Sequence, residues 1–272
     1  LKTGGYIDGT FKSYENDEND IKVYGASQLY PAVISDAFTT FSHSGQPDCT
    51  WYLKNLKINQ GFDTTATAKS GSNAIVILDG DVSFAGAVTV TAGDTLDLNG
   101  QRMECSVALT NSGTVDFDVS GGLNSMLICG NDCNLGSTVN NKNLGTIIMR
   151  NTSNKVATLP DGTYGGLHIL GSNQVSLDSA QDLGTTPVTV GSVASTDLGY
   201  NLTCGNLTIP TGGILNGSGD THTVAGDFTT SGGLLGASCL ELTSSNKEYV
   251  YVADHADLDG PNSTGEITLE AW

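Results

Sequence analysis

Val88-Thr-Val90 is followed by a second short unit, Leu96-Asp-Leu98, and units of the same kind return as Val188-Thr-Val190 and Leu207-Thr-Ile209. In each unit the outer two side chains are apolar and the middle one is polar, which is the period of a half-buried β-strand. From residue 74 to residue 233 such units recur every ~8–13 residues, and no segment between them is long enough for a crossover helix. The sequence therefore predicts an all-β fold.

The segments between the units contain the dipeptides that form tight corners. Asn-Gly or Asp-Gly pairs stand at positions 79–80, 99–100, 161–162 and 216–217. Glycine and asparagine accept a positive φ, which the corners of a coil require, but the same pairs also favour β-hairpins. Two architectures are therefore open, a parallel β-solenoid (β-helix) and an antiparallel β-sandwich. We favour the solenoid, because the pattern continues for about 160 residues, whereas a sandwich closes after a handful of strands.

Composition narrows the function classes. The 272 residues include 35 Gly, and 15% are charged, against about 25% in an average soluble domain. Lys and Arg number 11 against 29 Asp and Glu, a net charge of −18, which keeps a protein soluble and repels nucleic acid. No apolar run approaches the ~18 residues of a membrane span. We expect an extracellular or virion scaffold that neither binds nucleic acid nor inserts into a membrane.

The chain divides into three regions: an aromatic-rich region 1–62, the predicted solenoid 63–235, and a final segment 236–272. The first region has two interpretations. It closes the end of the solenoid, as a terminal cap does in repeat proteins, or it docks onto another subunit. The residues that we select as candidate docking aromatics are Tyr24, Tyr30, Phe38, Phe41, Trp51 and Tyr52.

The six cysteines leave their chemistry open. Cys129 and Cys133, in the sequence Cys-Gly-Asn-Asp-Cys, are close enough to form a local disulfide at a corner. The alternative is that the cysteines are buried thiols, and Cys105 and Cys204 fit this role as small inward residues. A metal site would need further Cys or His ligands nearby in sequence, and none is present.

Two resemblances bear on function. Segments 92–100 and 208–219 resemble the repeats of phage and bacterial surface β-solenoids. Such repeats indicate the geometry of a coil and do not indicate a catalytic or binding chemistry. The end of the chain resembles the opening strands of a LamG-like, concanavalin-type lectin or glucanase jelly roll. The matching stretches are Cys239-Leu-Glu-Leu242, Glu248-Tyr-Val-Tyr-Val-Ala-Asp254 and Gly265-Glu-Ile-Thr-Leu-Glu-Ala-Trp272.

The second resemblance implies that the sequence stops inside a two-sheet sandwich that binds glycans, sometimes with calcium. The binding loops of that family would lie beyond Trp272, so no site residue is transferred to this chain. We expect no cofactor in the chain itself, and calcium only in the remainder of that domain.

An enzyme is the least favoured interpretation, although parallel β-helices do host polysaccharide hydrolases and lyases. Asp116 and Asp118 lie on one face of a predicted strand, ~7 Å apart, within the separation that glycoside hydrolysis uses. Outward Asp residues on such a strand are normally solvated, and His168 and His222 are isolated in sequence. We therefore predict no catalytic residue and no enzymatic activity.

These observations predict a structural virion protein, a phage fibre, appendage or capsid decoration that carries a lectin-like domain to glycans on the host surface. The first region would dock onto other virion proteins, and a homo-oligomer, with a trimer favoured, would add stiffness and avidity. The alternative is a bacterial cell-surface adhesin of the same architecture, and a glycan-degrading β-helix enzyme is the third possibility.

Overall fold

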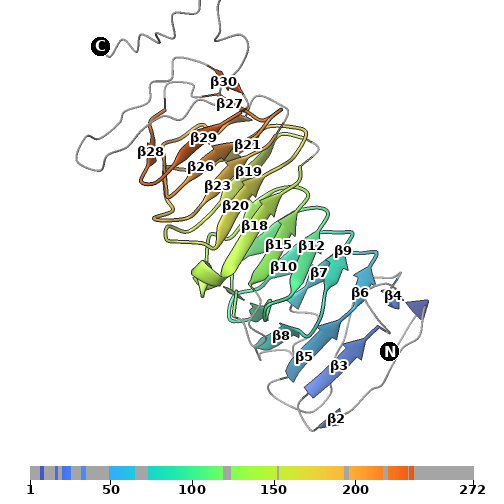
Figure 1. Cartoon of the computed structure of the whole chain (residues 1–272). Helices are drawn as coiled ribbons and strands as arrows, with labels where there is room; N and C mark the ends of the chain where they lie inside the picture. The colour runs from blue at the N-terminus through green and yellow to red at the C-terminus, as the bar shows by residue number, and fades with distance from the viewer. Residues whose placement is uncertain are drawn as a thin grey trace, which may run out of the picture.

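A computed structural model describes residues 7–8, 16–17, 20–25, 32–34, 49–64, 73–118, 124–151, 153–192, 196–216, 220–231 and 233–235. These residues wind into a parallel β-solenoid of about 8 turns. The coils are stacked along one long axis (Figure 1). The prediction of an all-β parallel solenoid is confirmed, and the antiparallel sandwich is excluded for the described coils, because their strands pair in parallel from β3 onward.

Sheet A runs along the whole described solenoid and has eleven strands in all. Its members pair in parallel, except for β1, which pairs with β4 in the antiparallel direction. They are β1 (Ile7–Asp8), β4 (Ala32–Ile34), β6 (Leu56–Ile58), β9 (Val82–Phe84), β12 (Arg102–Cys105), β15 (Ser125–Cys129), β18 (Gly145–Met149), β20 (Gly166–Ile169), β23 (Val188–Val190), β26 (Leu207–Ile209) and β29 (Phe228–Thr230).

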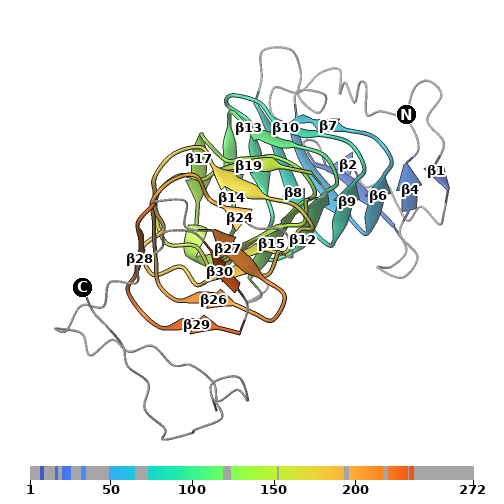
Figure 2. The same ribbon diagram turned by 90° about the horizontal axis from the view of Figure 1, so that it is seen from above.

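Two further faces complete each coil, and Figure 2 shows how they surround the axis. Sheet C holds β7 (Phe62–Asp63), β10 (Val88–Val90), β13 (Leu109–Asn111), β16 (Cys133–Asn134), β19 (Lys155–Thr158) and β21 (Val175–Leu177). Sheet B holds β2 (Asn16–Asp17), β3 (Asp20–Tyr24), β5 (Cys49–Lys54), β8 (Ala74–Leu78), β11 (Thr95–Asp97), β14 (Thr114–Asp116) and β17 (Thr138–Asn140).

The last coils replace these faces with two short sheets. Sheet D holds β22 (Gln181–Asp182), β25 (Leu202–Cys204) and β28 (His222–Val224), and sheet E holds β24 (Thr196–Asp197), β27 (Ile214–Asn216) and β30 (Gly233–Leu235). One earlier coil lacks its third strand, because the chain passes from β19 to β20 through residues 159–165. The 3-10 helix η2 (Lys142–Leu144) stands between β17 and β18.

The core is a stack of inward side chains, one or two from each strand. Along sheet A, Met103 pairs with Leu127, Leu127 with Ile147 and Ile147 with Leu167, and all four side chains are buried. In the parallel pairs of sheet A, paired residues lie 19 to 26 positions apart, from Val188 to Leu207 at the short end and from Leu56 to Val82 at the long end. A column of this kind buries apolar area in every coil, which stabilises the fold by about 25 cal/mol for each Å².

Left-handed asparagines make the corners between sheet B and sheet A. Asn55, Asn99 and Asn141 have φ values of 52°, 49° and 51°, and each stands between a sheet B strand and the next sheet A strand. Asn99 also donates its side-chain N–H to the carbonyl of Leu78 in the previous coil, at 3.0 Å. The predicted Asn99-Gly100 corner is therefore confirmed, and it is joined to its neighbouring coil by a side-chain bond.

Parallel pairing already includes residues before position 63, since β5 pairs with β8 and β6 with β9. The first coils are thus continuous with the predicted shaft. The antiparallel strands β1 and β2 lie at the edges of sheets A and B, the place where a cap is expected. Residues 236–272, with the lectin-like segment, lie outside the described residues.

Substitution at Asn99 tests the corner. Asn99→Val should lower the free energy of unfolding by about 1–3 kcal/mol, because a β-branched residue resists a positive φ and the bond to Leu78 is lost. Asn99→Gly should be milder, since glycine accepts the same φ. Chemical denaturation followed by circular dichroism measures both. Thr110→Val, at an exposed strand position, is the control and should stay within about 0.5 kcal/mol of the parent; an equal loss there would contradict the corner argument.

Candidate functional site

The outer surface of sheet B carries an ordered array of polar side chains. Thr95 pairs with Thr114, and Asp97 with Asp116, while the residues between them point into the core. The next strand, β17, continues the two columns with Thr138 and Asn140. We call this surface the acidic face and define it by its Thr column and by Asp97, Asp116, Asp118, Asn140 and Asn141.

Neighbouring amides hold the carboxylate of Asp116. Its Oδ1 accepts hydrogen bonds from Nδ2 of Asn141 at 2.8 Å and from the backbone N–H of Asp118 at 3.0 Å. Nδ2 of Asn140 lies 3.5 Å from Oδ2 of the same carboxylate. These partners orient the carboxylate without supplying a proton, because amide groups do not titrate near neutral pH.

The carboxyl group of Asp97 on this face has a raised pKa. Burial raises the pKa of its carboxyl to about 6, although the backbone N–H of Asn99, 2.8 Å from Oδ1, favours the charged form. The charges of Asp116 and Asp118 raise the pKa further. Strands in a sheet lie about 4.8 Å apart, so the paired carboxylates of Asp97 and Asp116 repel each other.

The structure places Asp116 and Asp118 on the same outer side, with buried Phe117 between them. Two carboxylates alone do not make a glycosidase, which needs one acid with a raised pKa and one charged partner across a bound sugar. Within the described ranges, no group of three or more His, Cys, Asp and Glu side chains is placed to hold a metal ion. The acidic face offers hydrogen-bond acceptors to solvent.

The candidate docking aromatics separate into three groups. Trp51 is only 1% exposed and belongs to the core of the first coils. Its side chain is therefore not available for the docking role that we predicted from the sequence. Tyr24 and Tyr52 are half-buried on the outer surface of β3 and β5. Tyr30, Phe38 and Phe41 lie outside the described residues.

Tyr24 and Tyr52 take part in two reciprocal pairs across β3 and β5. Lys22 pairs with Tyr52, and its Nζ lies 5.7 Å from the ring centroid; Lys54 pairs with Tyr24 at 5.6 Å. Cation–π contacts at such exposure contribute about 0.5–1 kcal/mol each. Sequence reasoning missed these pairs, although Lys22-Val-Tyr24 and Tyr52-Leu-Lys54 are reversed copies of one pattern that parallel pairing brings into contact.

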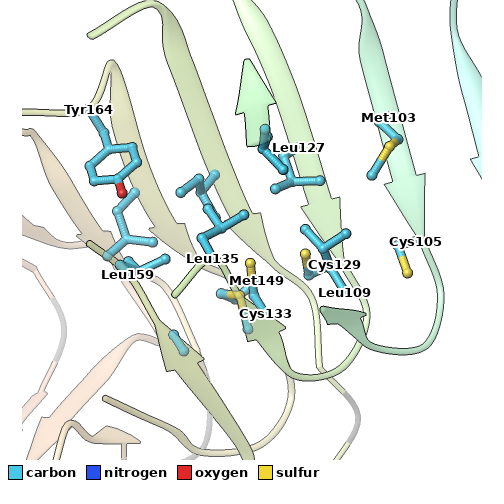
Figure 3. Close-up of a cluster of buried hydrophobic side chains, with 14 of the residues drawn as sticks. Met103, Cys105, Leu109, Leu127, Cys129, Cys133, Leu135, Met149, Leu159 and Tyr164 are labelled. Carbon is cyan, nitrogen blue, oxygen red and sulfur yellow. The ribbon is translucent and has the colours of Figure 1, made fainter. Parts of the chain in front are cut away.

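Four cysteines are buried and free: Cys105, Cys129, Cys133 and Cys204. The candidate disulfide between Cys129 and Cys133 is therefore not formed in this structure, in which both residues are buried thiols. Cys129 and Cys133 make a thiol–thiol hydrogen bond that, together with burial, raises the pKa of Cys129 well above its ordinary value. They lie in a sulfur-rich part of the core with Met103 and Met149 (Figure 3).

Comparison with known proteins adds no family. No protein-family model, no curated protein and no solved structure matches the chain. In the part of the chain that the structure describes, no helix is long and apolar enough to cross a membrane. The resemblances to phage solenoids and to LamG-like domains therefore stay predictions.

The acidity of Asp97 predicts a pH dependence. Its folded-state pKa of about 6 lies above the ordinary 3.8, so its stabilising contribution is complete below pH 3.8 and is lost as the pH rises through about 6. Asp97→Asn keeps the oxygen that accepts the N–H of Asn99, and it should stabilise the protein at pH 7 by about 1 kcal/mol at most, because solvent screens a half-exposed group.

Denaturation midpoints at pH 4, 5, 6 and 7 measure this effect. Asp182→Asn is the matched control, because Asp182 accepts a backbone N–H two residues later in the same way but is exposed. Equal pH profiles for the parent and for Asp97→Asn would refute the assignment.

Proposed function

We propose that the chain is the shaft of an attachment protein on the surface of a virion. The observation that carries the proposal is sheet A, which runs along the whole described solenoid above a continuous apolar core. Eleven strands at a spacing of ~4.8 Å give a ladder about 50 Å long, which is suited to holding its two ends apart.

The outer surfaces support a role based on shape. In the second half of the shaft the outward residue of sheet A is Thr189, Thr208 and Thr229 in three successive strands. Between residues 156 and 235 the sequence has no Lys or Arg. Such a surface carries few of the positively charged groups that assist proton transfer and anion binding at catalytic sites.

The attachment step rests on the resemblance of residues 239–272 to a lectin-like jelly roll. In the proposal, that domain binds host-surface glycans, the first region docks onto other virion proteins, and a homo-oligomer, a trimer by preference, multiplies weak sugar contacts into useful avidity. A bacterial cell-surface adhesin with the same parts is the second candidate, because the shaft would serve either particle equally.

Antibodies raised against the folded chain test the proposal. They should label the surface of purified virions in immunogold electron microscopy and should block adsorption of virions to host cells. Antibodies against an internal virion protein are the control and should do neither. Labelling of bacterial cells in the absence of virions would favour the adhesin. The absence of label on both virions and bacterial cells would contradict the attachment proposal.

A separate assay addresses the enzyme alternative. Incubation of the chain with host polysaccharides should release no reducing sugar above a blank, because we expect the carboxylates of the acidic face to be solvated and structural. Release of sugar would support the enzyme hypothesis if Asp116→Asn reduced the rate by about a hundredfold or more and the control Asp178→Asn did not. The enzyme hypothesis would then replace the proposal of a structural shaft.

A further inference from the structure

The last described coil contains an imidazole on its inner side. Strand β28 pairs in parallel with β25, so that His222 lies next to Leu202 and Val224 next to Cys204. Leu202 and Cys204 are buried core residues, whereas Thr223, between His222 and Val224, is exposed. His222 therefore continues the inward column that Gln181 and Leu202 form in the two previous coils.

Both ring nitrogens of His222 are buried and have no hydrogen-bond partner. A neutral imidazole in this place leaves one N–H donor unsatisfied, and the protonated ring would leave two donors and a charge. Burial lowers the pKa of His222, while Asp220 and Asp197 favour the charged form. On the neighbouring strand β25 the titratable group is Cys204, which stays neutral because burial raises its pKa to about 12.

His222 lies in the last described coil, whose inward residues are less well buried than those of the coil before it. Strands β28, β29 and β30 are the last described members of sheets D, A and E, and each pairs with one neighbour. The inward residues of this coil, Val224 and Phe228, are only partly buried, in contrast to their counterparts one coil earlier. Poorer burial of the inward side chains lowers the free energy that opening of this coil requires.

We infer that the last described coil, β28 to β30, is acid-sensitive and opens when His222 takes up a proton. Opening hydrates the imidazole and lets both nitrogens bond to water, which the closed coil prevents. The folded-state pKa lies below the ordinary 6.5, so the closed coil has its full stability above pH 6.5 and loses it as the pH falls. Asp97, on β11, acts with the opposite sign, so acid should not loosen the coil that holds it.

Hydrogen–deuterium exchange of the full chain at pH 7.5 and pH 5, corrected for intrinsic exchange rates, tests the inference. Peptides of β28 should lose protection several-fold at pH 5, with a limit of about thirtyfold set by an unfolded pKa of 6.5. Peptides of β12, β15 and β18 should keep theirs. Equal protection of β28 at the two pH values would overturn the inference.

Two variants identify the responsible group. His222→Leu matches the neighbouring Leu202 and should abolish the pH response of β28, and His222→Gln should do the same without adding apolar area. His168→Leu is the control, because His168 lies on the outer side of sheet A between buried Leu167 and Ile169, and it should leave the response unchanged. If the loss of protection of β28 at pH 5 persists in both His222 variants, another group causes it and the proposal is refuted.

Discussion

The parallel hydrogen-bond ladder of sheet A is the constraint on which the other features depend. Each strand places its inward side chain directly above that of the previous coil, so a column such as Met103, Leu127 and Ile147 forms only while the register holds. A slip of one residue would turn the apolar column to solvent and the polar column into the core. The outer faces, the acidic array and the Lys–Tyr pairs exist because this register repeats from coil to coil.

The sequence predicted the strand period, the parallel solenoid and the Asn99-Gly100 corner, because these depend on neighbours along the chain. It did not predict which residues meet across coils, since the separation between paired residues varies from coil to coil. The acidity of Asp97 and the pairing of Lys22 with Tyr52 depend on that separation. Trp51 was misjudged for the same reason: composition marks an aromatic residue but does not tell on which side of a strand it lies.

Side-chain acceptors at the corners add a second set of bonds between coils. Carboxylate or amide oxygens of Asp132, Asp161 and Asn206 accept backbone N–H groups from the following coil, where the strand ladders have ended. This use explains part of the abundance of Asp and Asn in a chain of net charge −18. Such residues are structural and need no ligand to account for them.

The coil without a third strand has a mechanical consequence. Between β17 and β22 the side of the shaft formed by sheets B and D is interrupted, and residues 159–165 cross it with isolated bonds such as Gly162 N–H to the carbonyl of Asp182 at 2.8 Å. At this level two ladders, in sheets A and C, join the successive coils. We expect torsional compliance to be greater here than where three ladders join the coils.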